Sequence, residues 1–170
     1  YLDFHTSYIA AGLADLGVEC VVKGISMPEI ERLRKNPTEM RSTNIAKTLT
    51  GSLIGTLAAR INEHAKDVDA VLMPAIVGLS GYSDVVRLKE MVSRPLHFLA
   101  TLPPSAPGIR VQMMLKKHFQ KSGGTYMLGD SVTGGGFEDG KLKYITTLNH
   151  GDFRFEADNF ILASGSFFSK

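Results

Sequence analysis

The segment TLPPSAPGIR combines two hydroxyl groups and a cation at the expected start of a helix. Ser105 and Pro107 are typical of a helix N-cap and first turn, and the apolar pattern from Ile109 to Gln120 predicts the helix that follows. The free N–H groups at such a helix start favour an anion, and Arg110 adds a positive charge. Thr101, Ser105 and Arg110 are therefore candidates for binding a phosphate, although Ser105 and Pro107 also suffice simply to begin a helix.

A second candidate anion site lies in the segment PTEMRSTNIA, where Arg41 and Asn44 stand three residues apart. Pro37 interrupts the preceding helix, and Thr38 is expected to cap a new one, so that Arg41 and Asn44 project from one helical face. Arg41 could bind a phosphate through two parallel hydrogen bonds. It could equally pair with Glu39 or another surface carboxylate, since exposed ion pairs are frequent.

His5 is the candidate catalytic residue for proton transfer. It begins a predicted helix beside Asp3, and ligands gather in open α/β sheets where a strand ends and such a helix begins. An imidazole can accept a proton near neutral pH. A lone histidine is also commonly structural, and His150, in a predicted hairpin turn, is given no role.

The composition restricts the classes of function and location. The formal charge of +2 comes from Lys and Arg residues interspersed with Asp and Glu, which argues against nucleic acid as a partner. Cys20 is the single cysteine, so we expect no disulfide, no metal site and a reducing, cytoplasmic setting. No stretch approaches the roughly 18 to 20 apolar residues that span a bilayer, so direct membrane insertion is not expected.

The first hundred residues alternate between helical and strand patterns. Helices are predicted over 4–16, from Pro28 to Arg34, over 40–49, 53–61 and 84–91, and strands over 18–22, 69–75 and 96–99. Cys20 would then lie in a buried strand. This alternation predicts an α/β fold with a parallel, αβ-layered, Rossmann-like sheet. We assign it to an inserted domain over residues 1–104.

The pattern changes over residues 105–170. After the helix at 109–120, short strands are predicted over 126–128, 131–137, 142–148 and 152–155, joined by turns at Asp139-Gly140 and Asn149–Gly151. These strands predict a β-meander. Residues 160–163 are expected to form one further, buried strand.

The order of helix, Gly-Gly stop, meander and the string EADNFILASGS resembles a stretch of flavoproteins with two dinucleotide-binding domains. In those proteins the stretch leads back from an inserted domain into the FAD-binding sheet. The resemblance implies that the last strand ends against the dinucleotide, where small residues let the backbone approach closely. It therefore assigns cofactor binding to Ala163, Ser164, Gly165 and Ser166. An ordinary strand with a glycine turn fits the same residues.

Longer strings narrow the family: PTEMRSTNIAKTL, VLMPAIVGL, TLPPSAPGIRVQ, GGTYMLGDSV and ILASGSFFS. In order and spacing they resemble the B subunits of anaerobic glycerol-3-phosphate dehydrogenases. The resemblance implies a flavin, FMN or FAD, a homologous FAD-bearing A subunit and an iron–sulfur C subunit. It also implies oxidation of sn-glycerol 3-phosphate to dihydroxyacetone phosphate, with electrons passed towards quinone.

The resemblance also predicts what these residues lack. Both ends look cut, and the family's N-terminal GxGxxG element and C-terminal flavin-binding half are not among the 170 residues. We therefore expect an internal segment that binds no flavin and is inactive alone, from a protein peripheral to the inner membrane through its complex. The alternative is a non-catalytic assembly or electron-transfer module of the same complex.

Overall fold

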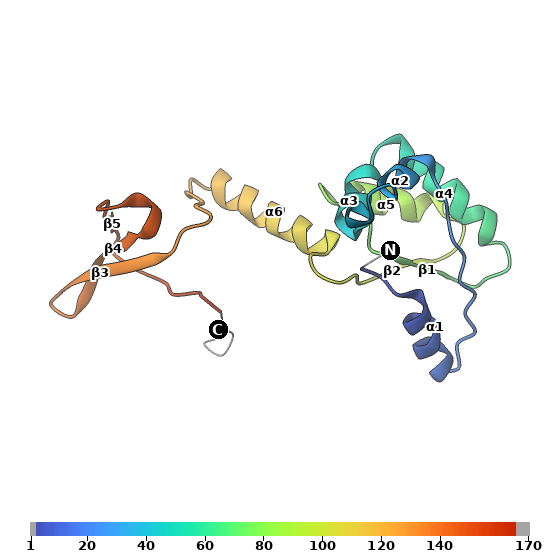
Figure 1. Cartoon of the computed structure of the whole chain (residues 1–170), viewed down its shortest axis with the longest axis horizontal. Helices are drawn as coiled ribbons and strands as arrows, with labels where there is room; N and C mark the ends of the chain where they lie inside the picture. The colour runs from blue at the N-terminus through green and yellow to red at the C-terminus, as the bar shows by residue number, and fades with distance from the viewer. Residues whose placement is uncertain (1–2, 166–170) are drawn as a thin grey trace. The chain divides into compact units, whose positions relative to one another are not determined.

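A computed structural model describes residues 3–165 and divides the chain into two compact units between Ser122 and Gly123 (Figure 1). We call residues 3–122 the N-terminal unit and residues 123–165 the meander unit. The helix that follows the TLPPS segment belongs to the N-terminal unit. The division into domains at 1–104 and 105–170 stays a prediction about the whole protein.

The N-terminal unit is an α/β assembly in which helices alternate with two short strands. Most of the predicted helices and strands are confirmed within a few residues. In chain order its elements are α1 (Thr6–Asp15), α2 (Pro28–Leu33), η1 (Pro37–Glu39), α3 (Ser42–Thr48), α4 (Ser52–His64), β1 (Val71–Pro74), α5 (Ser83–Met91), β2 (Leu96–Leu99) and α6 (Ala106–Lys121).

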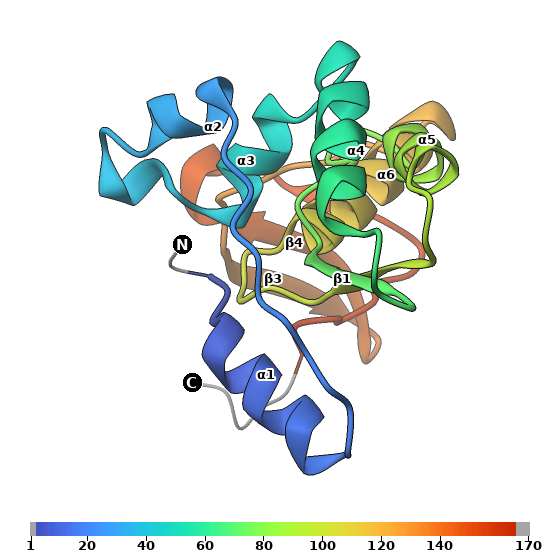
Figure 2. The ribbon, with the colours of Figure 1, turned by 90° about the vertical axis from the view of Figure 1, so that its right-hand side faces the viewer.

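The two strands β1 and β2 pair in parallel, with Val71 opposite Leu96 and Pro74 opposite Leu99. α5 makes the crossover between them, as parallel pairing requires. α4 and α5 lie on one side of this sheet and α1 lies on the other (Figures 1 and 2). The predicted α/β fold with a parallel sheet is therefore confirmed.

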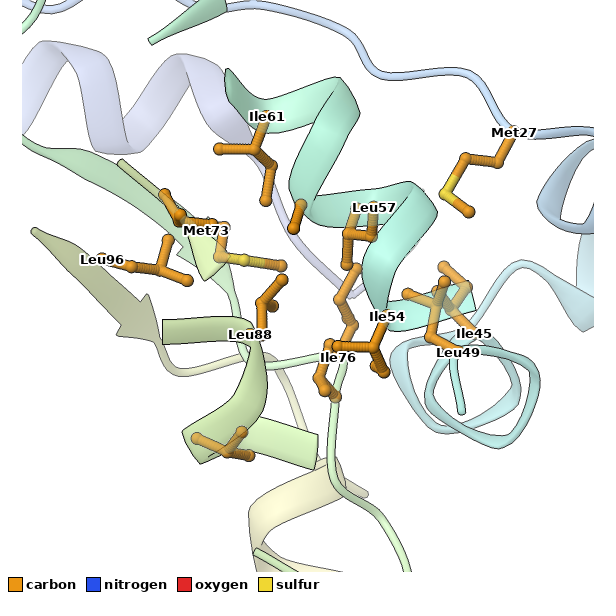
Figure 3. Packing of buried hydrophobic residues seen from close by; sticks show 14 of the residues in the cluster. Met27, Ile45, Leu49, Ile54, Leu57, Ile61, Met73, Ile76, Leu88 and Leu96 are labelled. Carbon is orange, nitrogen blue, oxygen red and sulfur yellow. The ribbon is translucent and has the colours of Figure 1, made fainter. Parts of the chain in front are cut away.

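The core of the N-terminal unit forms between α4, α5 and the sheet (Figure 3). Ile54, Leu57 and Ile61 recur at helical spacing on α4, so one face of that helix is buried. They pack in one cluster with Leu88 of α5 and Met73 of β1. The apolar stripe predicted over 53–61 therefore lies in the core of this unit.

One predicted strand of this unit is wrong. Residues 18–22 form no strand, and Val18, Val21 and Val22 are exposed. Cys20 is also exposed, in contrast to the expected burial. A β-branched run becomes a strand only where a neighbouring strand can accept its hydrogen bonds, and β1 and β2 pair only with each other among the described residues.

The meander unit contains three antiparallel strands in the order β3 (Val132–Glu138), β4 (Lys141–Thr147) and β5 (Phe155–Glu156). The turn between β3 and β4 places Asp139 at φ 50° and Gly140 at φ 75°. Positive φ at both central residues is what a tight Asp-Gly hairpin requires. The short helix η2 (Leu148–His150) joins β4 to β5. The predicted meander is therefore confirmed, although the strand expected over 152–155 is only the short Phe155–Glu156.

Two strands predicted around the meander are wrong. Residues 126–128 and 160–163 have no regular secondary structure. Ile161 and Leu162, expected to be buried, are 91% and 79% exposed. Both segments are apolar, but within the described residues neither has a strand beside it to pair with. The strand expected to return to a flavin-binding sheet is thus not formed by these residues.

Candidate functional site

Arg41 does not project from a helix that starts at Thr38. α3 begins at Ser42 with Arg41 at the N-cap position, while Thr38 lies in η1 and its hydroxyl donates to Asn36 Oδ1 at 2.8 Å. The Arg41 guanidinium lies 3.6 Å from a carboxylate oxygen of Asp3. The predicted helix start is therefore wrong, and the carboxylate that pairs with Arg41 is a buried one instead of the suggested surface group.

Asp3 joins three segments that are far apart in the sequence. Its side chain is only 4% exposed and accepts a hydrogen bond of 2.7 Å from the backbone N–H of Ser42. Its carbonyl oxygen accepts a bond of 3.0 Å from the N–H of Leu102. Asn44 turns the other way, since its Nδ2 donates to the carbonyl of Glu39. Arg41 and Asn44 are therefore separate contacts and not one clamp.

Thr101 lies two residues after β2 and precedes Leu102, whose N–H donates to the Asp3 carbonyl. Its side chain is 8% exposed, and its hydroxyl oxygen has no hydrogen-bond partner within the part of the chain that the structure describes. The hydroxyl of Ser42 is buried in the same way. Buried hydroxyls normally form a hydrogen bond. The hydroxyls of Thr101 and Ser42 are therefore available to bind a further polar group.

The start of α6 agrees with the helix start predicted from Ser105 and Pro107. Ser105 is the N-cap, and its hydroxyl oxygen accepts a hydrogen bond of 3.2 Å from the N–H of Gly108. Pro107 lies in the first turn, where its missing N–H costs nothing. The interpretation that Ser105 and Pro107 begin a helix is confirmed, and anion binding there stays a prediction.

Arg110 extends from the first turns of α6 to the loop after β1. Its Nη1 donates to the carbonyl of Gly78 at 2.8 Å, and its guanidinium lies 5.2 Å from the ring centre of Tyr82. Gly78 has φ 74°, and a Cβ atom there would lie 2.5 Å from a methyl carbon of Val85. Only glycine therefore allows the loop to approach Arg110 in this way.

His5 occupies the N-cap position of α1 without a side-chain cap, is exposed, and packs edge-on against Tyr8 with ring centres 5.8 Å apart. The imidazole is therefore accessible to solvent and to a ligand. Its part in proton transfer stays a prediction.

The residues assigned to the cofactor form an exposed stretch of chain. Ala163, Ser164 and Gly165 have no regular secondary structure, and Ser166 lies outside the described residues. Gly165 has φ 81°, and a Cβ atom placed on it would meet nothing within 4 Å. The backbone here is open to solvent, and cofactor binding by these residues stays a prediction.

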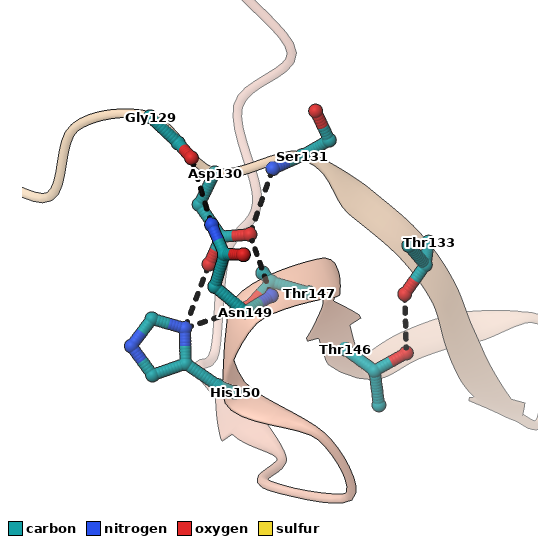
Figure 4. Close-up of polar contacts among 8 residues, drawn as sticks. All are labelled: Gly129, Asp130, Ser131, Thr133, Thr146, Thr147, Asn149 and His150. Carbon is teal, nitrogen blue, oxygen red and sulfur yellow. Dashed lines mark hydrogen bonds and ion pairs between the residues drawn. The ribbon is translucent and has the colours of Figure 1, made fainter.

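A polar network in the meander unit was missed by the sequence analysis (Figure 4). Asp130 accepts from the backbone N–H groups of Ser131 at 2.8 Å and Asn149 at 3.1 Å, and lies 2.7 Å from His150 Nδ1. A hydrogen bond from the Thr147 side chain, together with those from the other three residues, lowers the pKa of Asp130 to about 2.

No local signal could have found this network, because Asp130 and His150 lie 20 residues apart. His150 was given no role from its place in a turn, yet its ring is held by a carboxylate. The network ties the segment before β3 to the end of β4, so its evident effect is to fix the hairpin.

The described part of the chain contains neither a metal-binding cluster nor a membrane-spanning helix. No group of three or more His, Cys, Asp or Glu side chains that could hold a metal ion lies among residues 3–165. Within the same range no helix has the length and apolar character needed to cross a membrane.

The sequence is similar to that of known flavoproteins. The FAD binding domain family matches residues 1–170. The B subunit of anaerobic glycerol-3-phosphate dehydrogenase from Yersinia pestis is 35% identical over 170 residues, which cover 99% of this chain and 40% of the relative. The B subunit of the same name from Vibrio vulnificus is 40% identical over 149 residues, 86% of this chain and 34% of the relative.

The corresponding B subunit from Haemophilus influenzae is 37% identical over 175 residues, which cover 100% of this chain and 40% of the relative. These identities confirm the resemblance to B subunits inferred from the sequence strings. The chain spans about 40% of the length of the curated relatives it matches. No solved structure matches it.

Proposed function

We propose that this chain, which belongs to the FAD-binding domain family, forms part of a flavin-dependent dehydrogenase subunit that oxidises sn-glycerol 3-phosphate to dihydroxyacetone phosphate. The observation that carries the proposal is the 35–40% identity to proteins named as B subunits of anaerobic glycerol-3-phosphate dehydrogenase. Family membership supports the flavin-linked dehydrogenase. The substrate is inferred from the name of the relatives. The transfer of electrons towards quinone is inferred from the resemblance of the sequence strings to B subunits.

A flavin, FMN or FAD, would supply the acceptor for the two electrons that leave the alcohol. Ala163, Ser164 and Gly165 would lie against it, because their side chains are small and their backbone is exposed. Ser166 completes the proposed stretch. A flavin site needs further walls, which we place outside these residues. We therefore expect the 170-residue chain alone to retain no flavin and to show no turnover.

The chain's own side chains would handle the proton and the phosphate. Oxidation of a secondary alcohol requires a base near the hydroxyl, and His5 is our candidate because its ring is exposed. Ser105 and Arg110, at the start of α6, would bind the phosphate. Arg41 and Thr101, which both lie near the contacts of Asp3, are kept as a second candidate group, and Asn44 is kept as a separate candidate.

The contacts of the two arginines favour the group at the start of α6. Arg41 is already paired with Asp3, whereas the contacts of Arg110 are a backbone carbonyl and an aromatic ring. A guanidinium that pairs with a carboxylate has less positive charge to offer an anion. Arg110 is therefore the better phosphate ligand, and replacement of Arg41 should act mainly on stability.

The test uses the full-length protein assembled with its partner subunits. We expect Arg110→Ala to raise the KM for sn-glycerol 3-phosphate about tenfold or more, because a charge-assisted hydrogen bond contributes about 1.5–3 kcal/mol. Arg60→Ala is the control, since Arg60 is exposed and pairs with nearby Glu63. Flavin content should be measured for each subunit in parallel.

A second candidate function is a non-catalytic assembly or electron-transfer module of the same complex. The exposed apolar side chains of the meander unit, such as Phe137 and Phe153, favour it because they suit a subunit interface. The partners would be an FAD-bearing A subunit and an iron–sulfur C subunit, in the cytoplasm at the inner membrane. Stoichiometric flavin with unchanged turnover in both Arg41→Ala and Arg110→Ala would establish this alternative.

A further inference from the structure

A pocket of about 370 Å³ opens in the N-terminal unit between α5, β2 and the start of α6. Lys89 of α5, His97 and Phe98 of β2, and Arg110 of α6 contribute to its lining, with Tyr82 at the start of α5. All of these residues belong to one unit, so the pocket does not depend on where the meander unit lies. Its volume falls in the range for small-molecule sites.

The lining is positively charged without compensation. No Asp or Glu contributes to it, and among residues 3–165 neither Lys89 nor Arg110 forms an ion pair with a carboxylate. Two unpaired cations in one hollow therefore create a local positive potential that attracts an anion.

Both cations rest on aromatic rings of the pocket wall. Lys89 Nζ lies 5.8 Å from the ring centre of Phe98, and the Arg110 guanidinium lies 5.2 Å from that of Tyr82. Such contacts hold a long side chain in place while leaving its N–H groups available. Arg110 is fixed further by its bond to the Gly78 carbonyl, which uses only Nη1. The guanidinium is thus oriented before any ligand arrives.

We propose that this pocket binds the phosphate group of a small phosphate monoester, with Arg110 and Lys89 as its two cationic ligands. Arg110 can donate through its remaining N–H groups, and Lys89 acts as a second point charge. The apolar walls formed by Val77 and Val85 suit a short carbon chain. The proposal rests on the proposed function through Arg110, and it adds Lys89 and the size of the ligand.

The experiment measures binding by the full-length protein with calorimetry, so that no turnover is needed. The probes are sn-glycerol 3-phosphate, FMN, inorganic phosphate and uncharged glycerol. We expect sn-glycerol 3-phosphate to bind and glycerol not to bind, with binding weakened at high salt. We expect Lys89→Gln and Arg110→Gln each to weaken binding about tenfold or more.

Two matched variants serve as controls. Arg87→Gln removes an arginine that, like Arg110, donates to a backbone carbonyl, in this case that of Gly51, but does not line the pocket. Lys121→Gln removes an exposed lysine at the end of α6. Neither should change binding. Unfolding midpoints of all variants show whether a loss of binding comes from a loss of fold.

The outcomes separate the pocket from the dehydrogenase function. Unchanged sn-glycerol 3-phosphate binding in folded Lys89→Gln and Arg110→Gln proteins would overturn the pocket proposal, whatever the turnover. Preserved phosphate binding in a protein that, once assembled with its partner subunits, does not oxidise sn-glycerol 3-phosphate would support the pocket and overturn the proposed function. Tighter binding of FMN than of the three-carbon ester, lost in the same variants, would overturn the assignment to a small ester.

Discussion

The N-terminal unit and the meander unit are each stabilised internally by a different kind of interaction. In the N-terminal unit fifteen buried apolar side chains form one cluster that includes α4, α5 and both strands. Among residues 123–165 only Thr147 is buried. The meander unit instead relies on its strand pairing, its turn and the contacts of Asp130.

This difference explains why the candidate site with a defined lining lies in the N-terminal unit. A packed core fixes the elements around it, so the pocket formed by α5, β2 and α6 has a defined lining. A three-stranded meander with exposed apolar side chains has little apolar burial of its own. The N-terminal unit is therefore expected to respond to core substitutions, and the meander unit to substitutions that change backbone geometry or charge.

The largest effect is expected for Leu88→Ala in the N-terminal unit. Leu88 is fully buried in the core, so its truncation should lower the free energy of unfolding by about 2–5 kcal/mol. Urea denaturation followed by circular dichroism measures the change. Leu115→Ala on α6 is the matched control, because Leu115 is 65% exposed and its loss should cost little. Equal effects of the two variants would contradict the core described above.

A smaller effect is expected for Gly135→Ala in β3. A Cβ atom at Gly135 would lie 2.8 Å from the carbonyl oxygen of Tyr144 in the neighbouring strand. The strands must shift apart, which should cost about 1–3 kcal/mol in the meander unit. Amide hydrogen exchange of β4 reports the loosening.

Gly12→Ala provides the contrast to Gly135→Ala. Gly12 lies inside α1, and a Cβ atom there would meet nothing within 4 Å. Alanine is the better helix former, so this variant should stabilise α1 by about 1 kcal/mol or less. If the amide protection of β4 is unchanged in Gly135→Ala, close pairing of the strands is not what holds the meander unit together.

Local sequence patterns predicted the elements that carry their own signals. The apolar run before Pro74 and the run Leu96–Leu99 identified β1 and β2, and Asp139-Gly140 identified the hairpin turn. The runs at 18–22 and 160–163 look equally strand-like but form no strand. Apolar character does not say whether a neighbouring strand is available, and that information is not local.

The candidate site shows the same limit. The cap formed by Ser105 was predictable because donor and acceptor lie three residues apart. The contact between Asp3 and Ser42 spans 39 residues, and that between Asp130 and His150 spans 20. The pocket around Arg110 likewise combines residues from three elements. Such contacts depend on how helices and strands pack, so residue types at fixed spacing could not reveal them.

A further prediction concerns the pH dependence of the meander unit. The pKa of Asp130 is lowered from 3.8 to about 2 in the folded chain, so the folded state favours the carboxylate. The stabilisation is therefore fully present above about pH 4 and is lost as the pH falls towards 2. Amide exchange or NMR signals of Ser131 and Asn149 should show the hairpin loosening in this window.

Asp130→Asn tests the origin of that pH dependence. The amide side chain cannot ionise, so the variant should already be less stable at pH 7 and should change little between pH 4 and 2. Asp152→Asn is a control on an exposed aspartate of the same unit. If the hairpin of Asp130→Asn still loosens between pH 4 and 2, another titrating group is responsible for the pH dependence.

The smallest effect is expected for Glu63→Gln on α4. Glu63 pairs with Arg60 at 3.2 Å, but both side chains are about half exposed, at 55% and 51%. Water and salt screen such a pair, so its loss should lower the free energy of unfolding by about 0.5 kcal/mol or less. A double-mutant cycle with Arg60→Gln measures the coupling, which should vanish at high salt. A coupling as large as the effect of Leu88→Ala would mean that surface charges, and not the apolar cluster, hold the N-terminal unit together.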